Sequence, residues 1–343
     1  MIPHNRPTLG PEESEAAARV IASAWLAQGR EVAAFEDEIC AQLGVSEGHA
    51  VALSSGSAAL FLALRALGAQ ASKVACPVYS CSALANAIEL AGASPHFIDT
   101  APGSPNIDPG ALSRTVTPFA IVPHMFGVPV DIARATAQGI VVIEDCAQAI
   151  GASFGGSPVG LQGDAAVFSF YATKMITSGG QGGMFVSKDR GIADAVRDYR
   201  EFDCRRDRKP RFNFQMTDVQ AAIGRTQLKK LPAFVARREE IFAHYRRAGF
   251  ALVEAPAAGA ARYRAVIRVK DPHALIDELD RHGIKAIVPV EDWELLAPAE
   301  NFANAAAFAR TSLSLPVFPS LSDADVARIV DSVGRTVAAA ALS

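Results

Sequence analysis

Three short segments of the chain carry small, acidic and basic residues in an order that could do chemistry. The first is Ser-Ser-Gly-Ser-Ala at residues 54–58, which separates an apolar strand pattern from an apolar helix pattern. Small residues let a ligand approach the backbone, and the free N–H groups of a helix start favour a phosphate, to which Ser57 would add a hydroxyl. The alternative interpretation is an ordinary turn before a helix.

The second segment, residues 140–148, places two carboxylates directly after an apolar strand pattern. Ile-Val-Val-Ile is followed by Glu144, Asp145, Cys146, Ala147 and Gln148. A carboxylate at a strand end can hold a proton on a ring nitrogen, as pyridoxal phosphate requires when its ring accepts electrons. Alternatively, Asp145 caps a following helix. We interpret Cys146 as a small buried filler rather than a nucleophile.

The third segment contains a lysine among aromatic and small residues. Lys174 lies in Ser-Phe-Tyr-Ala-Thr-Lys-Met-Ile-Thr at residues 169–177, and a glycine-rich stretch follows at 179–183. A lysine that is shielded from water can lose its proton and attack a carbonyl to form a Schiff base. The other interpretation is a surface lysine whose alkyl chain packs on the protein.

Strand patterns that alternate with helix patterns must position these segments. Strands are predicted at residues 49–53, 74–77, 96–98, 119–123, 140–143, 165–170 and 184–187, and helices at 11–27, 30–43, 58–67, 82–91 and 132–138. This alternation predicts an α/β fold with a mostly parallel sheet flanked by helices. Ligands bind at the carboxyl ends of such strands, where all three segments begin.

The second half of the chain follows a different pattern. Helices are predicted at residues 217–231 and 233–247, with Pro232 as a kink or boundary between them. After these come a strand at 263–269, a helix at 273–282, a strand at 284–288 and a last helix at 323–341. We therefore predict a large domain over residues 1–232 and a smaller C-terminal domain over residues 233–343.

Composition excludes several classes of protein. Half of the 343 residues are apolar, and 33 basic against 36 acidic residues give a net charge of −3. Disorder, nucleic-acid binding and membrane binding are therefore not indicated, and the N-terminus lacks the apolar stretch of a signal peptide. The five cysteines include no CxxC pair and the seven histidines no HExxH motif, so we expect no metal site and a cytoplasmic location.

Together the segments resemble the DegT/StrS-type sugar aminotransferases, a branch of the fold-type-I pyridoxal-phosphate enzymes of the aspartate aminotransferase superfamily. The resemblance extends over nearly the whole chain. It is carried by blocks at residues 29–36, 55–60, 144–148, 168–174, 213–224 and 313–316. The order and spacing of these blocks make the resemblance specific, and it implies the fold-type-I architecture with a small α+β C-terminal domain.

The resemblance implies a role for individual residues. Lys174 would hold pyridoxal 5'-phosphate as a Schiff base and then move protons, and Asp145 would pair with the ring nitrogen. Gln148 would lie near the ring hydroxyl, and the phosphate would be held by Gly56, Ser57 and Ser169. Asn213 would reach the phosphate of a neighbouring subunit, which implies a homodimer with shared active sites.

The implied function is transfer of an amino group to a keto-sugar, with a nucleotide-linked sugar as the expected substrate and glutamate as the donor. Two alternatives stay open: a related enzyme that acts on a non-sugar ring or eliminates water, and a cofactor-binding regulator or scaffold without turnover. The dehydratase branch replaces the lysine with histidine, so Lys174 argues against elimination.

Two positions depart from the family pattern. Cys81 stands where the family usually has an aromatic residue that stacks on the ring, so stacking is lost or supplied by Tyr79 or another ring. Gln181 stands where glutamate is usual.

Two further features allow two interpretations each. His124 could line the crevice or be a satisfied structural histidine. The arginine-rich stretch at 197–211 could contact a nucleotide diphosphate or form a solvated loop.

Overall fold

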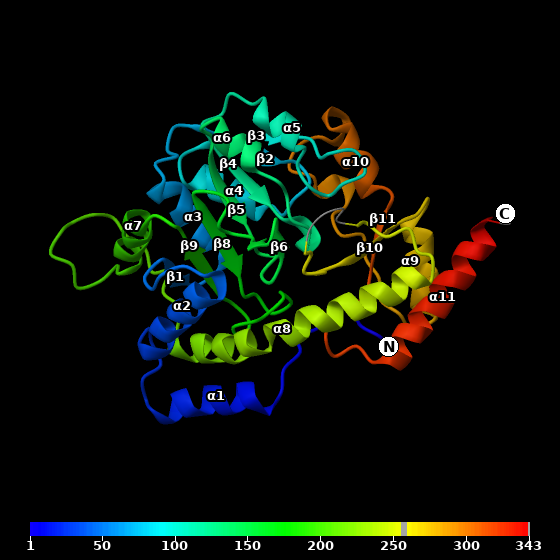
Figure 1. Ribbon diagram of the computed structural model, residues 1–343, viewed down its shortest axis with the longest axis horizontal. Coiled ribbons are helices and arrows are strands. Elements are labelled where there is room, and N and C mark those ends of the chain that lie inside the picture. Colours follow the sequence, from blue (N-terminus) through cyan, green and yellow to red (C-terminus); the bar gives the residue numbers. More distant parts are fainter. Residues whose placement is uncertain (255–258, 342–343) are drawn as a thin grey trace.

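A seven-stranded mixed sheet forms the centre of the larger part of the protein (Figure 1). The computed structural model describes residues 1–254 and 259–341, the side chains of 336–341 excepted. The strand order is β1-β9-β8-β5-β4-β2-β3; β9 runs antiparallel to both β1 and β8, and the other neighbours are parallel. The strands are β1 (Ala50–Leu53), β2 (Lys73–Pro77), β3 (Ser94–Ile98), β4 (Phe119–Pro123), β5 (Val141–Asp145), β8 (Ala165–Ser169) and β9 (Gly183–Val186).

Helices cover both faces of this sheet, because successive strand residues point to opposite sides. Ala50 and Ala52 of β1 pack in the core beneath α2 and α8, whereas Val51 and Leu53 pack against α3. The strands β1, β5, β8 and β9 are thus buried on both faces, whereas the edge strand β3 is partly exposed. The helices that precede α8 are α1 (Pro11–Ala22), α2 (Arg30–Leu43), α3 (Gly56–Ala66), α4 (Ala83–Leu90), α5 (Pro109–Ser113), α6 (Ala133–Ala137) and α7 (Arg190–Arg200).

The long helix α8 (Asp218–Arg247) connects the sheet to a smaller C-terminal part, as the yellow-green ribbon in Figure 1 shows. The smaller part has its own apolar core around the antiparallel pair β10–β11. Its elements are β10 (Ala265–Arg268), α9 (Pro272–Arg281), α10 (Ala303–Ala309), β11 (Ser312–Leu315) and α11 (Asp323–Ala341), and a short hairpin of β6 (Ser153–Phe154) and β7 (Ser157–Pro158) lies outside both sheets. The α/β prediction is confirmed. In the described part of the chain, no helix is long and apolar enough to cross a bilayer.

Pro232 does not separate two helices, contrary to the prediction of one helix on each side of it. It lies inside the 30 residues of α8. Apolar burial on both sides of the proline explains this, since Leu231 and Phe234 belong to the large core, which offsets the lost backbone hydrogen bond. Ile241 and Tyr245, further along the same helix, belong to the small core. A division into residues 1–232 and 233–343 would therefore fall within one helix, and it stays a proposal.

Several element boundaries differ from the predictions for local reasons. The first helix ends at Ala22 rather than residue 27, because Ala24 adopts a left-handed backbone conformation (φ 59°). The strand predicted at residues 284–288 does not form; Ile284 and Ile287 make isolated β-bridges instead. The predicted turn at 54–58 is shorter than expected, since α3 already begins at Gly56.

The N-terminus of α2 is capped from a distant helix. The Asp218 carboxylate at the start of α8 accepts N–H bonds from Gly29, Glu31 and Val32 at 2.8, 3.3 and 3.1 Å. Asp218 is buried, and its negative charge lies where the dipole of α2 favours it. Asp218 thus connects the start of α8 to the start of α2.

Candidate active site

The three segments predicted from the sequence meet at one cavity. It has a volume of about 270 Å³ and lies where β1, β2, β4, β5 and β8 end. Among its lining residues are Ser55, Gly56, Ser57, Ser80, Cys81, His124, Asp145, Gln148, Ser169, Tyr171, Lys174 and Gln181. The expectation that a parallel sheet would bring the segments together at its carboxyl edge agrees with this geometry.

The first turn of α3 forms one wall of the cavity. The Ser55 side chain caps the helix by accepting the Ala58 N–H at 3.1 Å, which leaves the N–H groups of Gly56 and Ser57 free of partners among the described residues. A Cβ on Gly56 would lie 2.9 Å from the Ser169 Cβ, so glycine is needed for this close approach. The wall can hold an anion through free N–H groups and the hydroxyls of Ser57 and Ser169.

Asp145 ends β5 at the bottom of the cavity and is 8% exposed. One of its carboxylate oxygens accepts the Ala147 N–H at 2.9 Å, and the described residues offer the other no hydrogen-bond donor. Burial raises the pKa of Asp145 above its ordinary value, although the Ala147 N–H and the charge of Lys174 act in the opposite direction. A buried carboxylate with a free oxygen is well suited to a cationic group of a ligand.

Lys174 reaches the same cavity from the turn after β8. The side chain is half-buried, and its Nζ has no hydrogen-bond or ion-pair partner among the described residues. Its Nζ lies 5.4 Å from the centroid of the Tyr263 ring. An amine held next to Asp145 without a partner of its own is available to attack a carbonyl group.

The remaining predicted site residues lie at different distances from this centre. Gln148 lines the cavity, and its Oε1 accepts the Phe126 N–H at 2.8 Å, which fixes the amide. Gln181 also lines the cavity and is exposed. Asn213 is exposed and does not line the cavity; its Oδ1 accepts the Gln215 N–H at 3.0 Å within its own loop.

Cys81 is exposed at the cavity, and the structure shows how the nearby Tyr79 is used. The Tyr79 ring is fully buried and packs edge-on against Phe126 and Phe308, with centroids 6.3 and 5.2 Å apart. It belongs to the apolar contact between the two parts of the chain and does not line the cavity. Tyr171, which is 46% exposed, is an aromatic residue that lines the cavity together with Cys81.

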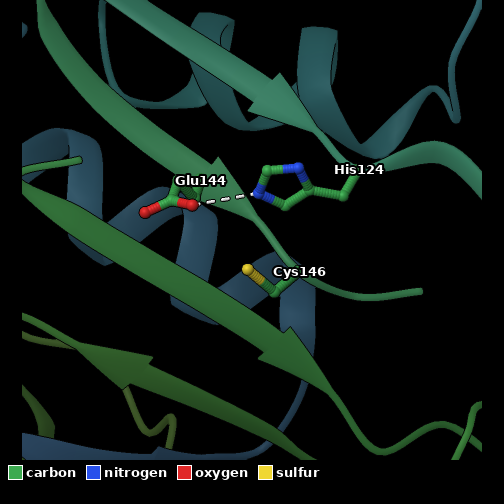
Figure 2. A group of neighbouring side chains, drawn as sticks. All are labelled: His124, Glu144 and Cys146. Carbon is green, nitrogen blue, oxygen red and sulfur yellow. Dashed lines mark hydrogen bonds and ion pairs between the residues drawn. The ribbon is translucent and has the colours of Figure 1, made fainter. Parts of the chain in front are cut away.

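His124, Glu144 and Cys146 form a buried cluster beside the cavity (Figure 2). Their potential metal-ligand atoms lie within 4.8 Å of one another. The His124 Nδ1 accepts the Val130 N–H at 3.0 Å, so its Nε2 carries the proton and donates to Glu144 at 3.0 Å. Glu144 also accepts N–H groups of Gly160, Gln162 and Gly163 at 3.0, 2.7 and 2.8 Å.

This bonding indicates a structural role for the cluster. Both His124 nitrogens and both Glu144 oxygens already have partners, so a metal ion would have to displace them. Burial raises the pKa of the Cys146 thiol well above its ordinary value, which disfavours the thiolate that a nucleophile or a metal ligand needs. The interpretation of His124 as a satisfied histidine therefore describes it better than a substrate contact.

The arginine-rich stretch is largely bonded within the protein. Arg200 is buried and pairs with Glu36, and it donates to the Ala52 carbonyl. Arg211 pairs with Asp198 and Asp207. No helix was predicted from the sequence over the residues of α7. The ion pairs of Arg200 and Arg211 hold this helix and the exposed loop that follows it in place. The paired arginines are thus used structurally.

Sequence patterns did not identify four residues next to Lys174. They are His4 and Asn5 near the N-terminus, and Tyr263 and Arg264 directly before β10. None belongs to a local motif, because they come together through packing of segments more than 80 residues apart. The sequence signal for Tyr263 and Arg264 was an aromatic residue followed by an arginine before a strand, and this pattern is common in proteins.

The residues of the cavity fit pyridoxal 5'-phosphate. The free N–H groups and hydroxyls at the start of α3, kept open by Gly56, suit its phosphate. Asp145 has an unbonded buried oxygen for the ring nitrogen, and Lys174 has an unpaired amine for the aldehyde. These three requirements are met by residues that line one cavity.

Comparisons with known proteins agree with this fit. The sequence model of the DegT/DnrJ/EryC1/StrS aminotransferase family matches residues 7–334. Spore coat polysaccharide biosynthesis protein SpsC of Bacillus subtilis (strain 168) is 33% identical, with 97% of this chain and 96% of SpsC covered. GDP-perosamine synthase of Caulobacter vibrioides is 30% identical, with 96% and 97% covered. The crystal structure of the aminotransferase TlmJ from Streptoalloteichus hindustanus superimposes with a TM-score of 0.92 at 29% identity, covering 99% and 100%.

Proposed function

Because this chain belongs to the DegT/DnrJ/EryC1/StrS aminotransferase family, we propose that it converts a keto-sugar to an amino-sugar, with glutamate as the amino donor and a nucleotide on the sugar. It is an aminotransferase that uses pyridoxal phosphate, as the resemblance implied. The observation that carries the proposal is the Lys174 amine, which has no partner among the described residues and lines a cavity together with Asp145 and the start of α3.

When bound, the cofactor supplies an aldehyde that condenses with amines and a ring that withdraws electrons from the carbon next to the nitrogen. The chain's own part begins with its anion-binding wall, where Gly56, Ser57 and Ser169 would hold the phosphate. Asp145 would keep a proton on the ring nitrogen, because a buried carboxylate beside a cation favours the charged pair.

Lys174 would act twice in this scheme. Its amine would first hold the cofactor and would then be displaced by the amine of the donor. Once free, it would remove a proton from one carbon and return it to another, because its Nζ faces the cavity and is bound to no other side chain of the described residues. Gln148, fixed by the Phe126 N–H, would orient the ring hydroxyl.

The keto-sugar assignment is supported by the relatives rather than by a recognised sugar pocket. GDP-perosamine synthase is named for a nucleotide sugar, and SpsC for polysaccharide biosynthesis. A non-sugar ring is the alternative substrate. It is favoured by the exposed Cys81 at a position where this family usually has an aromatic residue, since that change alters the cavity next to the reacting ring.

The two half-reactions test the proposed function separately. Holo protein mixed with glutamate alone should lose the visible absorbance of the bound aldehyde form and release 2-oxoglutarate. The resulting amine form should then aminate at least one member of a panel of nucleotide-linked keto-sugars. Conversion of cyclic ketones without a nucleotide, but of none of the sugars, would instead support the non-sugar alternative.

We also propose a homodimer in which Asn213 completes the partner's phosphate site. Asn213 and the neighbouring Phe212, which is 67% exposed, belong to the segment between α7 and α8, whose loop extends outward beside α7 in Figure 1. Trp25 and Ile21 near the end of α1 are 62% and 60% exposed. Apolar side chains exposed in this way would be covered in a dimer.

Mixed dimers test this arrangement. Asn213→Ala and Lys174→Ala chains should each be nearly inactive alone, whereas a co-refolded mixture should regain activity. In a mixed dimer, one site combines an intact Lys174 with an intact Asn213 from the other chain. Failure to regain activity, with dimers present by light scattering, would mean that Asn213 serves its own subunit or none.

A cytoplasmic location is part of the proposal. The five cysteines are free thiols, and Cys81 and Cys204 among them are exposed. Exposed thiols persist most readily in a reducing compartment.

A further inference from the structure

A second cavity lies in the smaller part of the protein, apart from the active-site cavity. It has a volume of about 1090 Å³, compared with about 270 Å³ for the active-site cavity. Residues from the end of β10, the start of α9 and parts of α10 and α11 line it, in the region where Figure 1 shows α9 beside α11. Among the described residues, none lines both cavities. A cavity of this size can hold a small organic molecule.

Apolar side chains form a large part of its wall. Phe250 and Val269 are partly buried, and both pack against the small core. The Phe250 ring stacks on Tyr245, with the two ring centroids 5.9 Å apart. Ala251, before β10, and Ala274, in the first turn of α9, are exposed at the same cavity. A ligand that covers these side chains gains free energy by burying an apolar body against them.

Arg268, the last residue of β10, lines this cavity with nitrogen atoms that have no acceptor. Its guanidinium lies over the Phe308 ring, with Cζ 4.6 Å from the ring centroid. Nη2 donates to the Ala307 carbonyl at 3.4 Å and to the Thr311 hydroxyl. Nε is buried without a partner, and Nη1 makes no hydrogen bond with the described residues. The guanidinium is therefore fixed in place by one nitrogen and one ring, and it keeps donors for a ligand oxygen.

Lys270 adds a second cation to the same end of the cavity. Its side chain is exposed and lines the cavity two residues after Arg268. No carboxylate of the described residues pairs with Lys270 or with Arg268. An oxyanion at this end of the cavity would thus meet two positive charges that the protein itself leaves unpaired.

The carboxylates that line the cavity have partners of their own. Asp271 caps α9 by accepting the Ala274 N–H at 3.0 Å. The other three lie next to basic side chains: Glu278 pairs with Arg281 and His282, Glu291 lies 3.5 Å from His273, and Asp292 pairs with Arg310. Among the charged side chains of the lining, those without a partner are therefore cations.

We propose that this cavity binds an amphipathic organic anion, with a hydrocarbon body against Phe250 and Val269 and a carboxylate or phosphate monoester on Arg268 and Lys270. The inference does not rest on the proposed aminotransferase function, because these residues do not line the active-site cavity. A planar guanidinium matches the oxygens of either head group, and the lysine contributes a point charge.

Calorimetry with the cofactor-loaded protein tests the ligand class. Octanoate and octyl phosphate carry the two head groups on one tail, octanol lacks the charge, and inorganic phosphate lacks the tail. At least one of the two amphiphiles should bind about 10-fold or more tightly than octanol or inorganic phosphate, and the tighter of the two identifies the head group. Shortening its tail by two CH₂ groups should raise the Kd about 10-fold, since each buried CH₂ contributes to binding.

Charge variants test the two cations. Arg268→Gln should raise the Kd of the tighter amphiphile about 10-fold or more, because a charged hydrogen bond is lost. Lys270→Gln should raise it less, about two- to fivefold, because Lys270 is exposed to solvent. Arg335→Gln is the matched control and should leave the Kd unchanged. Arg335 is an exposed cation of α11 that does not line the cavity and donates to the Asp331 carbonyl.

A variant that fills the cavity tests the location without removing a charge. Ala274→Trp places a large side chain in the cavity lining and should abolish binding. Because Ala274 is exposed, this change should leave the fold intact, so it stays decisive if Arg268→Gln does not fold. Ala236→Trp, at an exposed position of α8 outside the lining, should bind like the wild type. Thermal midpoints would show which variants are folded.

Four results would overturn the inference. The first is no binding of either amphiphile. The second is binding of octanol or inorganic phosphate within about twofold of the tighter amphiphile, which would remove the need for either the charge or the tail. The third is unchanged binding in Ala274→Trp, which would place the ligand elsewhere. The fourth is an unchanged Kd in folded Arg268→Gln.

Discussion

Removal of the Glu144 carboxylate should strongly destabilise the protein without touching the reacting groups. Glu144 is fully buried and accepts hydrogen bonds from His124 and from three backbone N–H groups at 2.7–3.0 Å. Glu144→Ala would leave these donors unpaired in the protein interior. Although each such bond contributes about 1.5–3 kcal/mol, losses within one network do not add, so the free energy of unfolding should fall by about 3–5 kcal/mol.

Two further variants separate the loss of the Glu144 charge from a change of side-chain volume and from the loss of any carboxylate. Glu144→Gln keeps the volume but turns an amide NH₂ toward N–H donors, so it should lose a large part of the same stability. Glu47→Ala removes an exposed carboxylate from the loop before β1 and should change the free energy of unfolding by less than about 0.5 kcal/mol. Urea unfolding followed by circular dichroism would measure all three.

The pH dependence of the free energy of unfolding provides a further test of the role of Glu144. Burial raises the pKa of Glu144, but the His124 and backbone hydrogen bonds outweigh burial and lower it overall. Because the folded-state pKa lies below the unfolded value, the contribution of Glu144 is present above about pH 4.5 and is lost as the pH falls below it. Glu144→Ala should lack this part of the acid destabilisation. A loss below about 1 kcal/mol in Glu144→Ala, or a rise of the thermal midpoint of the wild type with added Zn²⁺, would refute the structural role of the cluster.

Two more predictions concern the packing around the site. Asp218→Ala should lower the free energy of unfolding by about 2–3 kcal/mol, because three N–H groups at the start of α2 lose their acceptor. Asp218→Asn should lower it less. Denaturation midpoints would measure both variants, and equal losses would contradict the capping role. Gly183→Ala should weaken cofactor binding, since a Cβ there would collide with the Ser55 backbone and lie 2.6 Å from the Gly56 nitrogen. Gly334→Ala, in open space on α11, should leave cofactor binding unchanged. Cofactor titration would measure both variants, and an unchanged Kd for Gly183→Ala would contradict the close packing at α3.

Local patterns were sufficient for the framework of this site. The helix Arg30–Leu43 was predicted with its exact bounds, because Gly44 provides a left-handed C-terminal cap that the sequence shows directly. The three segments that carry Gly56, Asp145 and Lys174 could also be predicted from local patterns. Each lies at a strand end, and a parallel sheet places strand ends along one edge.

The rest of the site depends on contacts that no local pattern encodes. Arg264 and His4 lie 260 positions apart and meet through the pairing of β10 with β11 and the path of the N-terminal segment. The continuity of α8 through Pro232 likewise follows from cores on both sides of the helix, which outweigh the preference of proline to interrupt it. Tertiary packing decided both outcomes.

The claim on which the account depends is that the Lys174 amine holds the cofactor. Borohydride reduction of the protein loaded with pyridoxal phosphate, followed by proteolysis and mass spectrometry, should place a phosphopyridoxyl group on Lys174, and Lys174→Ala should show neither the adduct nor the visible absorbance. A phosphopyridoxyl group on another lysine, with Lys174 unmodified, would contradict the account.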